Sequence, residues 1–255
     1  MHPYAWAWDF EGVVLVPALT LAYAVAIRGH ATAPWRIACF TAGMLLIVVA
    51  FVTPLQTLSV HYLLTAHLLQ NVVLAEWAPV LCVLGIPPSL AGSIARVRLV
   101  RSLVRPWVAL PVWLATYFVW HVPALYDAAL RNPSSLLHLE HVCYFAAGCL
   151  MWWPIVHAVP WNLTAGGKAA YLVAAFFLAS PLGLLFALIP DPIYGFYEAA
   201  PRIWGLSALA DQQVAGMTMA GEQAVVFFAA FLVFLVRFLS EEEARDDREA
   251  KVAAR

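Results

Sequence analysis

The sequence predicts an all-α fold, an integral membrane bundle of seven transmembrane helices. Of its 255 residues, 64% are hydrophobic and 11% are charged, whereas soluble proteins contain roughly 45–50% and about 25% of these classes. A soluble domain has too little interior to bury such a share of apolar side chains. The net charge is −1 at pH 7, so the chain has no basic field that would attract nucleic acid. We therefore expect the chain to lie in a lipid bilayer and not to bind nucleic acid.

Seven apolar stretches provide the spans, because a hydrocarbon core about 30 Å thick requires roughly 20 apolar residues per helix. Proline, glycine or charged residues separate the stretches, and Thr53, Pro54 and Gln56 mark a turn between the second and the third. The predicted spans are Gly12–Ile27, Ile37–Leu58, His61–Leu84, Trp107–His121, Leu137–His157, Ala169–Ile189 and Gln213–Phe238. Residues 1–240 form the membrane domain. Residues 241–255 form a charged tail, either a solvated helix extension or disordered.

Lysine and arginine predict the orientation, because they are enriched in cytoplasmic loops. If the spans alternate in direction, Arg131 and Arg202 lie on one side of the membrane and the other 12 basic residues lie on the opposite side. We therefore expect the N-terminus outside and the C-terminal tail in the cytoplasm.

The cysteines and the first residues carry no functional signal. Cys39, Cys82, Cys143 and Cys149 each lie inside an apolar run, which predicts small core residues and no disulfide or thiolate metal site. Met1–Glu11 has no basic region before its first apolar stretch and no small-residue cleavage pattern after it, so we expect this segment to be retained.

Five of the eight histidines fall at the outer level of this topology. They come from three predicted helices and are His61, His67, His121, His138 and His141. Placing a polar side chain in the hydrocarbon core costs free energy, and such side chains are often functional. A cluster of five histidines therefore favours a metal or cofactor site.

Helical spacing indicates which of these side chains share a face. His138 and His141, at i and i+3, point to the same side of their helix, and Glu140 between them points elsewhere. Glu140 is a candidate for orienting a ligating imidazole. His67 has Asn71 one turn further along its own face, whereas His61 lies roughly 120° around the helix, at the rim.

The ends of two further spans complete the predicted site. His121 precedes Val122 and Pro123, where the proline ends the helix and frees carbonyl groups. The last span begins after Asp211 and Gln212, which are rim candidates, and adds two methionines. Met217 and Met219 are two residues apart and point to different faces, so at most one is a ligand, and we take Met217. Imidazole and thioether together suit copper, and methionine favours the cuprous ion.

Several motifs in this order resemble those of the CtaG-like cytochrome c oxidase assembly factors, the seven-span type associated with caa-type oxidases. The likeness runs from about Thr53 to Phe238, and its motifs are Ala66–Gln70, Ala78–Leu81, Leu84–Pro87, Trp120–Leu130, His138–His141, Met151–Pro154, Pro201–Leu206 and Asp211–Gly216. The resemblance implies a non-enzymatic protein of the bacterial plasma membrane. It also implies a role in supplying copper to, or assembling, the copper centres of haem-copper oxidases, with oxidase subunits or an extracytoplasmic copper chaperone as partners.

Asn71 departs from the family pattern, in which a second histidine usually stands at this position. An amide hydrogen-bonds but is a poor copper ligand. The resemblance therefore implies a site that is one ligand short, rebuilt around His61 or Met217, or altered in role.

Three functions remain open at this point. The leading hypothesis is a copper-handling assembly factor with His67, His121, His138, His141 and Met217 as ligands. A membrane haem protein with histidines from facing helices as axial ligands is the main alternative. The third is a transporter or scaffold with a histidine-lined cavity.

Overall fold

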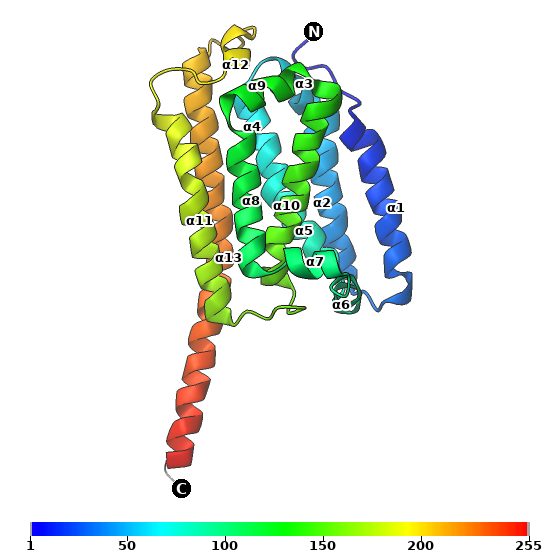
Figure 1. Cartoon of the computed structure of the whole chain (residues 1–255), viewed down its shortest axis with the longest axis vertical. Helices are drawn as coiled ribbons and strands as arrows, with labels where there is room; N and C mark the ends of the chain where they lie inside the picture. Colours follow the sequence, from blue (N-terminus) through cyan, green and yellow to red (C-terminus); the bar gives the residue numbers. More distant parts are fainter. Residues whose placement is uncertain (1, 254–255) are drawn as a thin grey trace.

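The computed structural model describes residues 2–253 and contains helices as its only regular elements over that range. One end of the bundle carries α3, α9, α12 and the N-terminal residues, and we call it the histidine end (Figure 1). The α-helices are α1 (Val16–Ala26), α2 (Pro34–Val52), α3 (Pro54–His61), α4 (Leu64–Val72), α5 (Ala78–Gly85), α6 (Pro88–Ile94), α7 (Arg98–Leu103), α8 (Pro106–Trp120), α9 (Pro123–Arg131), α10 (His138–Val156), α11 (Ala165–Leu188), α12 (Gly195–Ala199) and α13 (Ala208–Ala253).

Four short helical segments of other pitch join or extend these helices. Glu11–Leu15 leads into α1, Ile27–Gly29 ends it, Val73–Trp77 connects α4 with α5, and Pro133–Leu137 leads into α10. Three of them are π-helical turns, which often occur at functional sites. The first places Glu11 at the histidine end, and the last begins the helix that carries His138.

Within residues 2–253, six helices are long and apolar enough to cross a membrane, and the number is seven if α8 and α9 count as one bent span. The chain is therefore a multi-pass membrane protein. α8 has 15 residues, about 22 Å at 1.5 Å per residue, and α9 continues it after a bend of 73°. Pro123 at the start of α9 accounts for the bend, because proline cannot continue the hydrogen bonding of α8.

The expected boundary between the second and third spans is wrong in its details. The predicted span Ile37–Leu58 ends at Val52, where Thr53 breaks the helix and its hydroxyl caps α3 by accepting a hydrogen bond from the Leu55 amide. The third span begins at Leu64. His61 consequently ends the separate helix α3 and is not part of a span.

Small residues bring the central helices close together. A Cβ atom at Gly148 of α10 would collide with the backbone of Ala75 and with Pro79, so only glycine fits there. This contact joins α10 to the α4–α5 span. The histidines of both elements are thereby held in one bundle.

The last helix is much longer than a membrane is thick. α13 has 46 residues, about 69 Å at 1.5 Å per residue, against a hydrocarbon core of roughly 30 Å. Its C-terminal part extends beyond the other helices, away from the histidine end (Figure 1). The charged residues from 241 to 253 are thus a helix extension, one of the two forms expected for the tail; residues 254–255 lie outside the described range.

Candidate metal centre

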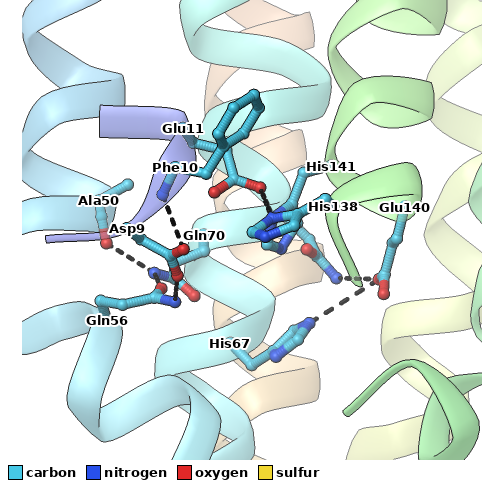
Figure 2. Close-up of polar contacts among 11 residues, drawn as sticks. Asp9, Phe10, Glu11, Ala50, Gln56, His67, Gln70, His138, Glu140 and His141 are labelled. Carbon is cyan, nitrogen blue, oxygen red and sulfur yellow. Dashed lines mark hydrogen bonds and ion pairs between the residues drawn. The ribbon is translucent and has the colours of Figure 1, made fainter. Parts of the chain in front are cut away.

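Glu11, His138 and His141 converge at the histidine end of the bundle. Nδ1 of His138 lies 2.6 Å, and Nδ1 of His141 lies 2.8 Å, from the same Glu11 carboxylate oxygen, Oε1. One ligand atom from each of the three residues lies within 4.8 Å of the others, so the three residues could hold one metal ion. We call these residues the outer trio. Figure 2 shows the carboxylate facing the two rings.

Local helix geometry explains the convergence. His138 and His141 open α10 and lie one turn apart, as the spacing predicted. Glu11 begins the first span and is 1% exposed, and His141 is 2% exposed. His138 is 24% exposed, so it gives the trio a side that faces outward.

Hydrogen bonds hold the N-terminal segment that carries Glu11. The Ala7 amide donates to Val52 O at 3.1 Å, and the Thr57 hydroxyl donates to Ala5 O at 2.8 Å. The Gln56 amide donates to Asp9, and Gln70 donates in turn to Gln56 Oε1 at 2.6 Å. This network ties the segment to α2, α3 and α4 beside the trio, and Figure 2 shows its part formed by Asp9, Gln56 and Gln70.

His67 and Glu140 form a second group next to the trio. His67 Nε2 lies 3.7 Å from Glu140 Oε1, and the Asn71 amide donates to the same oxygen at 3.2 Å. The rings of His67 and His141 are 6.4 Å apart between centroids. We call His67, Asn71 and Glu140 the inner group. Glu140, expected to point away from its neighbouring histidines, therefore faces His67 of α4.

Buried polar atoms around the inner group lack hydrogen-bond partners in the described structure. They are both ring nitrogens of His67, Nε2 of His141, Oε2 of Glu140 and Oδ1 of Asn71. Buried polar groups in native proteins are nearly always paired, because an unpaired one costs roughly 1–3 kcal/mol. A concentration of lone-pair atoms at one place is what a bound cation would satisfy.

His121 lies near the inner group without joining it. Its Nδ1 is 2.7 Å from Tyr117 O and 3.1 Å from the Tyr144 hydroxyl, and its Nε2 is buried without a partner. The rings of His121 and His67 each pack against Tyr126, with centroid distances of 5.7 and 5.1 Å. The structure thus places a tyrosine in contact with both imidazoles, and His121 is not a member of the trio.

The methionine and rim candidates lie elsewhere. Met217 is 58% exposed on α13, so the structure does not bring its sulfur to the buried histidines. Met219, two residues on, is the buried one of the pair. His61 is exposed at the end of α3, where its ring packs edge-on against Tyr62.

Asp211 and Gln212 make structural contacts. The Asp211 carboxylate accepts hydrogen bonds from the Leu64 and Thr65 amides at 2.7 and 3.1 Å and from the Thr65 hydroxyl at 2.7 Å. It therefore caps the start of α4 from α13 and positions the turn that carries His67. Gln212 bonds the backbone of the loop before α12, accepting from the Ile193 amide at 2.7 Å.

The sequence matches one protein-family model over most of its length. The model of the family described as cytochrome c oxidase caa3 assembly factor (Caa3_CtaG) matches residues 19–241. The chain belongs to the caa3 assembly factor family. Membership indicates a non-catalytic role in oxidase assembly. No curated protein and no solved structure matches the chain.

The matched segment includes every histidine discussed above but not Glu11, which precedes residue 19. Glu11 is also absent from the site residues predicted from the sequence, where it is only an acidic residue before an apolar run. The feature of the sequence that could have identified Glu11 is its position at the start of the first span. An acid at the start of the first span lies at the same level as the start of the fifth span in an alternating bundle, and that level already contained the histidines.

Proposed function

We propose that this caa3 assembly factor holds a copper ion at the outer trio and presents it during assembly of the copper centres of a caa3-type cytochrome c oxidase. The observation that carries the proposal is the convergence on one position of the buried Glu11 and His141 with the partly exposed His138. Imidazole nitrogen is a good ligand for copper, and one carboxylate balances the charge of a cuprous ion, which lowers the cost of holding it in a medium of low dielectric constant.

The trio is suited to transfer because it is buried on one side and open on the other. Partial exposure of His138 leaves a direction from which a donor or acceptor protein can approach. On the positive-inside rule this direction is extracytoplasmic. The partners we propose are oxidase subunits or an extracytoplasmic copper chaperone, in a bacterial plasma membrane.

Metal analysis of the purified full chain tests the copper site. We expect one cuprous ion per chain in the wild type and none in His141→Ala, because His141 is the buried nitrogen donor of the trio. His61→Ala, a histidine variant outside the cluster, is the matched control and should bind as the wild type does. A wild-type chain that binds no copper would refute the proposal.

A visible spectrum of the same sample separates the haem alternative. A protein whose histidines hold haem shows a Soret band as purified, and we expect none. Assembly itself is tested in a host lacking this gene. The wild-type gene should restore caa3-type oxidase activity, and the His141→Ala gene should leave the oxidase subunits present but deficient in copper.

A further inference from the structure

We propose that the inner group is a second resting position for the same metal ion, alternative to the outer trio, and that His141 belongs to both. The ligands of this inner position are His141 Nε2, His67 and Glu140. The inference rests on the proposed function in taking the ion to be a monovalent soft cation, but it concerns a site that the trio does not include.

The two nitrogens of His141 face different groups. Nδ1 lies 2.8 Å from Glu11 Oε1, and when Nδ1 carries the ring proton and donates this hydrogen bond to the carboxylate, Nε2 carries the lone pair. Nε2 is buried and has no hydrogen-bond partner in the described structure. At metal sites, a histidine that binds the metal through one nitrogen often donates a hydrogen bond from the other nitrogen to a carboxylate. Glu11 therefore changes from a ligand of the outer position to the carboxylate that orients His141 for the inner one.

His67 and Glu140 supply the remaining donors. His67 is 0% exposed and neither of its nitrogens is hydrogen-bonded. Its Nε2 is 3.7 Å from Glu140 Oε1, close to the separation of about 3.3–3.5 Å between two ligands of a tetrahedral ion with bonds of about 2.0–2.1 Å. The second carboxylate oxygen of Glu140 is unpaired. Small side-chain movements would bring these atoms around one ion.

The charge at each position and the single lone pair of His141 limit the ion to one position at a time. Each position contains one carboxylate, Glu11 or Glu140, which matches one positive charge. A neutral imidazole has a single lone pair, so His141 serves one position through Nδ1 or the other through Nε2. The ion would move inward by exchanging Nδ1 of His141 for Nε2, from a partly exposed position to a fully buried one. The ring proton would move the opposite way, from Nε2 to Nδ1, where Glu11 Oε1 accepts its hydrogen bond.

Paired variants test the shared ligand. Purified full-length variants are titrated with Ag⁺, a redox-stable monovalent soft ion, and the bound metal is counted after desalting. His138→Ala impairs only the outer position and His67→Ala only the inner one, so each variant should still bind one ion. The double variant should bind none, and His141→Ala alone should bind none. His61→Ala combined with His138→Ala is the matched control and should behave as His138→Ala.

Each other outcome overturns the inference. If His138→Ala or His67→Ala alone abolishes binding, only one position exists. If the double variant still binds an ion, His67 is not a ligand. Melting curves establish that the variants are folded, and His67→Gln, which keeps a polar side chain in the buried space, replaces His67→Ala if that variant does not fold. If the wild type binds no Ag⁺, the proposed function is contradicted. If the wild type binds one ion and either single variant binds none, only the second position is contradicted.

Discussion

Asp211 of α13 contacts the first turn of α4, and His67 belongs to that turn, yet the hydrogen bonding of the two side chains differs. Asp211 accepts three hydrogen bonds from Leu64 and Thr65 at the start of α4. His67, in the first turn of that helix, is as deeply buried and has no hydrogen bond from either ring nitrogen. Sequence reasoning assigned both residues to one site. The comparison indicates that hydrogen-bond saturation distinguishes a residue that builds the site from one that binds within it.

The largest effect on stability should come from the saturated residue. Asp211→Ala removes the acceptor of the buried Leu64 amide and of the partly buried Thr65 amide at the start of α4, and each charged hydrogen bond contributes about 1.5–3 kcal/mol. We expect a loss of about 3 kcal/mol or more, measured as a lower melting temperature in detergent. His67→Ala should change the melting temperature far less. Equal losses in the two variants would contradict the distinction drawn between them.

The carboxylate of the outer trio should affect metal affinity more than stability. Glu11→Gln keeps the shape of the side chain and removes its charge, so we expect metal affinity to fall roughly 10–100-fold, as for carboxylates that orient ligating histidines. Competition with a chelator of known affinity measures the change. Glu198→Gln, on the short helix α12, is the control. An unchanged affinity in Glu11→Gln would make Glu11 a purely structural partner of the histidines.

Glu140→Gln is the equivalent test for the inner position, and in the otherwise wild-type chain its effect should be smaller than that of Glu11→Gln. Glu140→Gln retains an acceptor for the Asn71 amide and removes the charge beside His67. We expect the affinity of the His138→Ala variant, which depends on the inner position, to fall roughly 10–100-fold, with a lesser change in the otherwise wild-type chain. An effect of equal size in both backgrounds would remove the distinction between the positions.

The smallest change should be a gain. Asn71→His places an imidazole on the face of α4 that carries His67, beside Glu140, and restores the residue that the family resemblance implies at this position. An additional nitrogen donor should tighten copper binding by up to about tenfold. The same chelator competition measures it. No gain would show that an imidazole at position 71 does not reach the ion.

Much of this architecture follows from the sequence alone. Apolar length predicted six membrane-crossing helices and the straight part of the bent α8–α9 pair, apart from the boundary between the second and third spans. Helical spacing predicted the shared face of His138 and His141. The orientation remains a prediction, testable by labelling cysteines introduced at Ser135 and Ala250, in a chain without its native cysteines, from opposite sides of the membrane.

What the sequence did not provide depends on rotation and on contacts between distant residues. The face of α13 that turns inward decides between Met217 and Met219, and two residues of spacing could not settle it. The roles of Glu11 and Asp211 arise from contacts with residues more than 120 positions away. No local pattern encodes such contacts.

The dependence of the trio on Glu11 also sets an order of events during synthesis. His138 follows Glu11 by 127 residues, which a ribosome adds in roughly 6–25 s at 5–20 residues per second. During that interval the first helix is already made while its two histidine partners are not. The trio therefore does not exist in the nascent chain until the start of α10 has been made and brought to Glu11, so the metal ion that we propose there can bind only afterwards.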